Sequence, residues 1–422
     1  MNILLHYCGT RFLVPALLLI LAGPFALAKD APNPIPANSV VSRTLPNGAT
    51  VLARSDPYAK MAIVDLWVRA GSVDGTPGAA HAVEHMLFKA SSAKGNDGSD
   101  AVVESAGGVI HASTLPDATH FWSLCPPDKV ATVASALVNL VQSTDFTDAG
   151  WEIERKVMRE ELERAKPELA DQARAALLKN LLDEADSMPV AGTNAGLSAL
   201  TPDSIRAFHK AHYGPDRMAM IVVGPVPVDS AVEACAKAMN ALEQNAAAPE
   251  SRADSLKARC VEATATDGKK TFTGLAFTLP DADQATLEVL CSVLRGRLNR
   301  DLSLVADSIR VQRLARRRPA VVILVQSPAR SASAVRASVI ETLRKDEPLA
   351  ASGAVAITGR LKWSWWLDRE SPTKQANALG TAFTLGAWKD ACAWPDSLTS
   401  VTAARLNAVL RMVADIAPES SE

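Results

Sequence analysis

The sequence has 422 residues, of which 48% are hydrophobic and 21% are charged, and its formal net charge is −2. This composition is that of globular proteins and excludes a disordered or collagen-like chain. Charges of both signs are mixed along the chain, which argues against a surface for nucleic acid or anionic membranes. The length predicts two substantial domains.

The first 28 residues have the pattern of a secretory signal peptide. Arg11 precedes an apolar run over residues 12–27 that ends in Ala26-Leu27-Ala28, a small-x-small cleavage pattern. An uncleaved membrane anchor is the alternative, but the run is shorter than the roughly 20 residues that a spanning helix needs. We therefore expect cleavage after Ala28, a periplasmic or secreted location, and no membrane span in the mature chain.

Strands and helices alternate through the first part of the mature chain. The turn Asn47-Gly48 lies between two extended runs and predicts a β-hairpin. Thr201 and Pro202 are typical of the cap and first position of a helix. In chain order, hydrophobic periodicity predicts a hairpin over 40–53, a strand over 61–70, helices over 81–89, 128–142, 151–166 and 204–212, and a strand over 218–223.

The second part of the chain repeats this layout. Residues 244–254 contain Ala, Pro and Ser without periodicity and predict a linker between the two parts. The order strand, helix, strand, helix then recurs over residues 271–279, 284–302, 320–326 and 333–345. The layouts of the two parts are similar, although no residue-level repeat relates them.

The segment His81-Ala82-Val83-Glu84-His85 has the spacing of a metal-binding helix. Two histidines four residues apart lie on one helical face, as two ligands of a single tetrahedral ion require. Glu84 falls on the same face, where it could deprotonate a metal-bound water without being a ligand itself. The pattern is the H-x-x-E-H form of the zinc-protease motif, and on its own it is weak because short patterns occur by chance.

A catalytic metal site needs a third protein ligand, and the acidic helix over residues 151–166 offers candidates. Glu154 and Glu161 are seven residues apart and therefore share one face. We expect Glu161 to be the third ligand and Glu154 to orient a ligating histidine. Glu160 is the alternative ligand, but it points about 100° away from that face.

Three ordered segments resemble the pitrilysin, insulinase and mitochondrial processing peptidase family, the inverzincins. RAGSVDGTPGAAHAVEHMLFK over residues 69–89 is similar to the family's zinc region, and ERKVMREE over 154–161 is similar to its distal glutamate signature. LTPDSIRAFHKAHYGP over 200–215 is similar to the segment that follows. Glu161 follows His85 by 76 positions, the separation that the family's third ligand has.

The resemblance implies a fold, a reaction and roles for particular residues. It implies an α+β fold of two similar α/β halves, each a mostly antiparallel sheet covered by helices, over residues 29–243 and 255–422. His81, His85 and Glu161 would bind Zn²⁺, Glu84 would be the general base of peptide hydrolysis by zinc-bound water, and Glu154 would support them. Two such units close like a clam around unfolded peptides, and the substrate lies as an added strand along the edge over residues 108–114.

The sequence departs from the family pattern at two places. His111-Ala112 stands at the substrate edge where Asn-Ala is usual, so His111 would contact the peptide or even the metal. The C-terminal half lacks the tyrosine that, with an arginine, holds substrate over the zinc; the region offers Arg297 or Arg300 and only Ser308. We therefore expect this chain to be the zinc-bearing subunit of a homo- or heterodimer with a second peptidase-family subunit.

The sequence thus predicts a zinc-dependent metalloendopeptidase. The alternative is a catalytically inactive assembly or chaperone-like subunit of the same fold, which the missing tyrosine favours and the intact metal-binding pattern opposes. Arg316-Arg317-Arg318 precedes a predicted strand, and we interpret it as a solvated strand end in preference to a site for an anionic partner.

Overall fold

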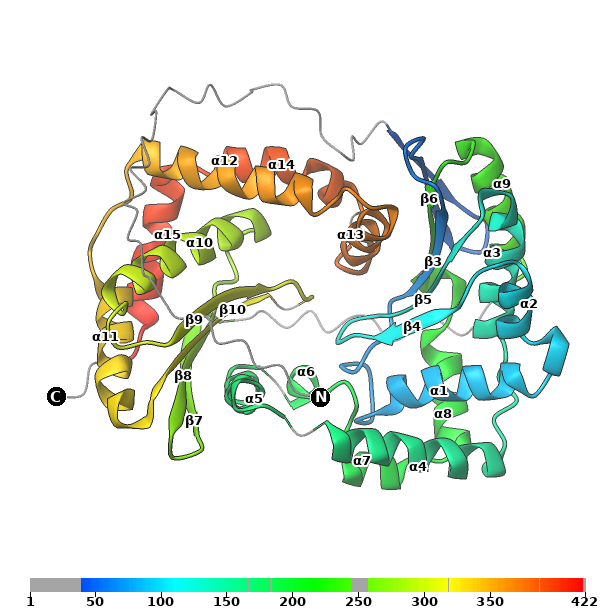
Figure 1. Ribbon diagram of the computed structural model, residues 1–422, viewed down its shortest axis with the longest axis horizontal. Helices are drawn as coiled ribbons and strands as arrows, with labels where there is room; N and C mark the ends of the chain where they lie inside the picture. Colours follow the sequence, from blue (N-terminus) through cyan, green and yellow to red (C-terminus); the bar gives the residue numbers. More distant parts are fainter. Residues whose placement is uncertain are drawn as a thin grey trace, which may run out of the picture. The chain divides into compact units, whose positions relative to one another are not determined.

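A computed structural model describes residues 39–165, 167–182, 184–243, 257–317, 319–386 and 388–419 (Figure 1). The predicted signal peptide over residues 1–28 and the predicted linker over 244–254 lie outside these residues. No helix in the described part of the chain is long and apolar enough to span a bilayer.

The first half is built on a six-stranded sheet in the order β1-β2-β6-β3-β5-β4. Neighbouring strands are antiparallel except β2 and β6, which are parallel. The predicted hairpin joins β1 to β2, and Gly48 there has a φ of 89°, which glycine adopts without steric cost. The strands are β1 Val40–Thr44, β2 Thr50–Ser55, β3 Ala62–Val68, β4 His111–Thr114, β5 Thr119–Cys125 and β6 Met218–Gly224.

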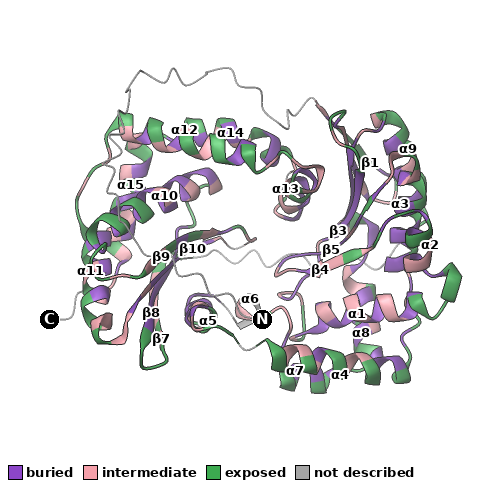
Figure 2. Cartoon of the chain, viewed as in Figure 1, coloured by how far each residue is buried: buried purple, intermediate pink, exposed green. Residues whose placement is uncertain are grey.

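Helices cover one face of this sheet and share a hydrophobic core with it (Figure 2). The predicted cap of α8 is confirmed as a capping box, because the Thr201 side chain accepts from the Ser204 N–H and the Ser204 hydroxyl accepts from the Thr201 N–H. The helices of this half are α1 Ala79–Ser92, α2 Ser99–Ser105, α3 Val130–Val141, α4 Asp148–Arg164, α5 Leu169–Leu181, α6 Glu184–Ser187, α7 Asn194–Ala199, α8 Pro202–His212 and α9 Val228–Met239.

The second half is built on a four-stranded antiparallel sheet in the order β7-β8-β10-β9. The predicted strand, helix, strand, helix order is present, and two further strands, β7 and β9, form the sheet edges. The strands are β7 Arg259–Thr266, β8 Lys270–Thr278, β9 Ser308–Leu314 and β10 Ala320–Pro328. The helices are α10 Gln284–Asp301, α11 Ala332–Arg344, α12 Ala351–Leu367, α13 Pro372–Thr384, α14 Lys389–Ser400 and α15 Ala403–Ile416.

The two halves share a connectivity. The order β3, α1, β4, β5, α3 in the first half matches β8, α10, β9, β10, α11 in the second, with α2 as an addition between α1 and β4. The strand pairing is also equivalent, since β5 lies between β3 and β4 and β10 lies between β8 and β9. The structure therefore confirms the predicted α+β fold of two similar halves.

Each half lends one helix to the sheet of the other. α5 packs on β7 and β8, and α13 packs on β3 and β6 (Figure 1). A glycine permits each close approach: a Cβ atom at Gly274 would lie 2.7 Å from the Leu177 side chain, and one at Gly380 would lie 2.0 Å from the Trp67 ring. The halves are thus joined through packed helices.

Candidate metal centre

Helix α1 brings the two predicted histidine ligands together. It begins after Gly78, whose φ of 89° turns the chain out of the loop that follows β3. One helical turn separates His81 from His85, and their Nε2 atoms are 3.2 Å apart. Both side chains are only about 15% exposed, so the pair lies in a largely dehydrated place.

Helix α4 supplies the carboxylate that is predicted to be the third ligand. The Oε2 atom of Glu161 lies 3.8 Å from His81 Nε2 and 3.6 Å from His85 Nε2. The alternative ligand, Glu160, instead forms an exposed ion pair with Arg164 at 2.6 Å. In the described part of the chain, His81, His85 and Glu161 form the group of three metal-ligating side chains whose donor atoms converge within 4.8 Å of one another.

The geometry and charge of this group fit a zinc ion. Tetrahedral bonds of about 2.0–2.1 Å place neighbouring donor atoms about 3.3 Å apart, close to the separations seen here. Burial, followed by the neighbouring His85, lowers the pKa of His81 to about 4. The imidazole is therefore neutral near pH 7, which is the form that binds a metal.

Glu154 of α4 contacts the His85 ring. Its Oε2 atom lies 3.1 Å from His85 Nδ1, on the far side of the ring from Glu161, and Lys89 lies 3.5 Å from its other oxygen. A carboxylate at Nδ1 fixes the N–H there and leaves Nε2 with its lone pair toward the cluster. His81 Nδ1, by contrast, is buried with no hydrogen-bond partner among the described residues.

Glu84 lies beside the cluster and is held by a residue that the sequence reasoning missed. The Thr114 hydroxyl, at the end of β4, donates a hydrogen bond of 2.6 Å to Glu84 Oε2. Burial raises the pKa of Glu84, while Thr114 and the nearby His85 and His120 oppose that rise. Thr114 lies 30 residues from Glu84, and only the pairing of β4 with β5 brings it to the site.

The predicted substrate edge is β4, the last strand of the six-stranded sheet. His111 is exposed and stacks on Trp122 of β5, with ring centroids 5.6 Å apart, and is not part of the ligand group. Ala112 faces the opposite side and packs against the core. His120 stacks between Trp122 and Trp67, and its Nδ1 lies 3.1 Å from a carboxylate oxygen of Asp65, so its ring is held by these three side chains.

The two arginines considered for the missing arginine–tyrosine pair are engaged elsewhere. Arg297 donates to the main-chain carbonyl of Glu347, and Arg300 pairs with the carboxylates of Glu347 and Asp301 at 2.8 and 2.7 Å. Ser308 is at the start of β9, where its hydroxyl lies 3.5 Å from Gln326 Oε1. These side chains bond within the second half of the chain.

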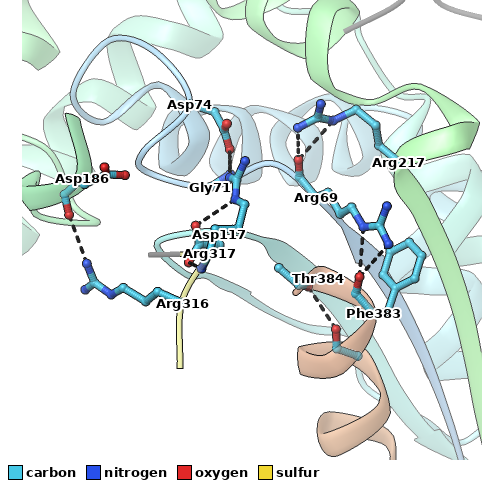
Figure 3. Close-up of polar contacts among 11 residues, drawn as sticks. Arg69, Gly71, Asp74, Asp117, Asp186, Arg217, Arg316, Arg317, Phe383 and Thr384 are labelled. Carbon is cyan, nitrogen blue, oxygen red and sulfur yellow. Dashed lines mark hydrogen bonds and ion pairs between the residues drawn. The ribbon is translucent and has the colours of Figure 1, made fainter. Parts of the chain in front are cut away.

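The interpretation of the arginine run as a solvated strand end is wrong for Arg317. Its guanidinium bridges Asp74, in the loop before α1, and Asp117, in the turn after β4, at 2.8 and 2.9 Å (Figure 3). Arg316 donates to the main-chain carbonyl of Asp186 at 3.0 Å. The connection between β9 and β10 is therefore attached to the turn that follows the predicted substrate edge.

The chain is similar in sequence to proteins that are named as peptidases. An uncharacterized zinc protease of Mycobacterium leprae is 30% identical over 200 residues, which are 46% of this chain and 44% of that protein. The mitochondrial-processing peptidase subunit beta of Neurospora crassa is 25% identical over 227 residues, which are 53% of this chain and 48% of the relative. The matches therefore span less than half of the length of these relatives.

Solved structures share the fold at low sequence identity. The peptidase M16 inactive domain from Pseudomonas fluorescens has a TM-score of 0.74 at 18% identity and covers 88% of this chain and 94% of that chain. Pitrilysin has a TM-score of 0.71 at 18% identity, over 89% of this chain and 43% of that one. The model of insulinase (peptidase family M16) matches residues 50–193, and that of the peptidase M16 inactive domain matches residues 199–318. The chain belongs to peptidase family M16, the family of insulinase, pitrilysin and the mitochondrial processing peptidases.

Proposed function

We propose that this protein is a zinc-dependent metalloendopeptidase that hydrolyses unfolded peptides or small proteins. One observation carries the proposal: donor atoms of His81, His85 and Glu161 converge within 4.8 Å, and Glu84 lies on the same helix as the two histidines. A structural zinc site would use four protein ligands. The described residues contribute three, which is the composition of a catalytic site.

Each side chain has a separate task in the reaction. His81, His85 and Glu161 would hold Zn²⁺, which when bound supplies Lewis-acid chemistry that polarises a carbonyl and lowers the pKa of water. Glu84 accepts the proton of the attacking water at its carboxylate and passes it to the leaving amine. Its burial favours this role because a dehydrated carboxylate is a stronger base, and the Thr114 hydroxyl keeps it in place.

The free edge of β4 would hold the substrate. An edge strand presents unpaired main-chain N–H and C=O groups, which bind an extended peptide without regard to its sequence. Thr114 of this strand contacts Glu84, so a peptide added along β4 runs beside the catalytic base. His111 and Trp122 lie on one face of that edge and would contact alternate side chains of the peptide.

Substitution of Glu84 tests the catalytic proposal. Glu84→Gln keeps the shape of the side chain and removes the base, so hydrolysis of an unstructured peptide library should fall roughly 10²–10⁴-fold while the zinc content stays unchanged. The control is Glu160→Gln on α4, whose side chain is exposed and paired with Arg164. Retained hydrolysis by Glu84→Gln would contradict the assignment of the base.

We also propose that the chain works as the zinc-bearing subunit of a dimer, because it lacks the C-terminal tyrosine of active relatives. The purified chain should be weakly active until a second peptidase-family subunit is added, and assays with and without co-purifying proteins check this. Full activity of a homogeneous preparation would contradict the need for a different partner. Zinc bound without turnover under any partner condition would support the alternative, an inactive assembly or chaperone-like subunit.

Export to the periplasm or medium is a further part of the proposal, and the apolar run over residues 12–27 supports it. N-terminal sequencing of the protein purified from a host cell should give a mature chain that begins at Lys29. An intact N-terminus in the cytoplasmic fraction would contradict export.

A further inference from the structure

A cavity of about 860 Å³ lies outside the metal centre. It is bounded by the start of α10, the end of β9, one face of α13, and parts of α12 and α14. None of the proposed zinc ligands lines it, and neither does Glu84. Its volume is within the range of ligand-binding pockets, about 300–1,000 Å³.

The cations in the cavity wall differ in their partners: two pair with carboxylates, Arg316 donates to a main-chain carbonyl, and two have neither kind of partner among the described residues. Arg313 pairs with Glu288 at 2.9 Å, and Arg317 pairs with Asp74 and Asp117. Among the described residues no ion pair joins Arg369 or Lys374 to a carboxylate. The Nε atom of Arg369 is buried and has no hydrogen-bond partner in the described part of the chain. A half-buried guanidinium in this state is stabilised when an anion binds to it.

Other charges and rings in the wall set the character of the cavity. Asp368 and Asp390 also line it; like Lys374 they are exposed, so water competes for all three charges. Two indole rings support arginines there: the Arg369 guanidinium lies 5.3 Å from the Trp365 ring centroid, and that of Arg313 lies 5.0 Å from the Trp394 centroid. The cavity therefore combines a half-buried arginine, whose Nε atom has no hydrogen-bond partner among the described residues, with flat apolar surface.

The cavity adjoins the end of the predicted substrate edge. Thr114, the last residue of β4, contacts Glu84, and Asp117 follows it by three residues. Asp117 holds Arg317, and Arg317 forms part of the cavity wall (Figure 3). A peptide that lies along β4 and continues past Thr114 in the direction of this turn therefore approaches the cavity.

We propose that this cavity binds a carboxylate-bearing segment of the peptide substrate, with Arg369 and Lys374 as the cationic contacts and the rings of Trp365 and Trp394 as apolar walls. The identification of the ligand as substrate rests on the proposed peptidase function. Carboxylates from aspartate or glutamate side chains and from a peptide C-terminus share the chemistry that arginine recognises. The protein then prefers acidic peptides over neutral ones of the same length.

Binding of labelled peptides to the full chain carrying Glu84→Gln tests this, since that variant holds peptides without cleaving them. Three versions of one short unstructured peptide are compared by fluorescence anisotropy: glutamates with an amidated C-terminus, glutamines with a free C-terminus, and glutamines with an amidated C-terminus. The glutamate peptide should bind about tenfold more tightly than the neutral amide, a difference of about 1.4 kcal/mol. Tighter binding of the free C-terminus alone would assign the carboxylate to the peptide end.

Arg369→Gln in the Glu84→Gln background should remove that preference and leave affinity for the neutral amide unchanged. The matched control is Arg360→Gln, which makes the same charge change at an exposed position of α12 that does not line the cavity. Ala378→Leu fills the cavity from α13 without removing any charge, and it should weaken the acidic peptide even if Arg369→Gln does not fold.

Equal affinity of all three peptides for the Glu84→Gln chain would overturn the proposal, as would an equal loss of affinity for charged and neutral peptides in Arg369→Gln. These results would leave the proposed peptidase function intact, because hydrolysis and zinc content are measured separately on the wild-type chain. Conversely, a wild-type chain that binds acidic peptides selectively but never cleaves them would refute the peptidase function and retain the cavity assignment.

Discussion

Helices α1 and α10 occupy equivalent places in the two halves and both bury apolar side chains in the core, but they differ in the side chains on their remaining faces. α1 follows β3 and carries His81, Glu84 and His85 on a face that remains partly open. α10 follows β8, and at the same stage of the layout its buried face is apolar, with Leu290 and Leu294 fully buried against the second sheet. The same connectivity thus carries the candidate metal centre on α1, whereas no comparable group of metal-ligating side chains lies in the described part of the second half.

The difference extends to the neighbouring helices. α4 lies against α1 and brings Glu154 and Glu161 to it, whereas α10 packs against α11, α12, α14 and α15, which bury leucine, valine and isoleucine side chains around it. All seven histidines of the sequence precede residue 213, so the second half has none. The fold therefore does not specify the chemistry; a few polar side chains and one supporting helix do.

Removal of the Glu161 carboxylate should have the largest effect, because the first half would then lack a complete set of three metal-ligating side chains, as the described part of the second half does. Glu161→Ala leaves two histidines, which hold zinc poorly, so bound metal should fall from one ion per chain to near zero and hydrolysis should fall by roughly 10³-fold or more. Elemental analysis and a peptide assay measure both. Glu160→Ala is the matched control one position earlier, and an unchanged metal content in Glu161→Ala would place the third ligand elsewhere.

Acid should destabilise the first half through its histidines. Burial lowers the pKa of His209 from 6.5 to about 4, although its Nε2–H donates to the Val141 carbonyl at 2.7 Å. Between pH 6.5 and pH 4 the unfolded chain therefore binds the extra proton, and the free energy of unfolding decreases as the pH falls through this window. For His209 alone the decrease is about 3 kcal/mol.

Urea unfolding of the metal-free protein at pH 7.5 and pH 4.5 measures this decrease in the free energy of unfolding. His209→Gln keeps an N–H donor but cannot take up the proton, so its unfolding free energy should change less between the two pH values than that of the wild type. The remaining pH dependence belongs to residues such as His81, whose pKa is also lowered. Equal pH dependence in the variant and the wild type would show that His209 titrates normally in the folded state.

Local signals in the sequence predicted much of the first half and its site. The Asn47-Gly48 turn, the Thr201 cap and the four-residue spacing of His81 and His85 each specify structure within one or two turns of chain, and the structure contains all three features. The shared face of Glu154 and Glu161 follows from helical periodicity in the same way. Such features depend on neighbours in the sequence, which is why the sequence alone suffices for them.

Features that depend on distant parts of the chain escaped prediction. Thr114 contacts Glu84 only because β4 pairs with β5, and Arg317 meets Asp74 across 243 residues. Edge strands β7 and β9 are only partly buried, whereas β8 and β10 are buried over most of their length. No local pattern predicts that α5 packs on the second sheet and α13 on the first. The glycines that permit these close approaches can be explained only from the packed structure.

The packing of α13 on the first sheet can be tested with two helical glycines, one in a crowded place and one in open space. These substitutions have the smallest expected effects. Gly380 of α13 packs against Trp67 of the first sheet, whereas Gly296 of α10 has open space at its Cβ position. Alanine raises helix propensity by about 0.8–1 kcal/mol at both. Gly380→Ala should nevertheless destabilise the protein by about 1–2 kcal/mol, because overpacking against the indole outweighs that gain. Gly296→Ala should stabilise it, so thermal unfolding that shifts upward for both variants would show that α13 does not pack tightly on the first sheet.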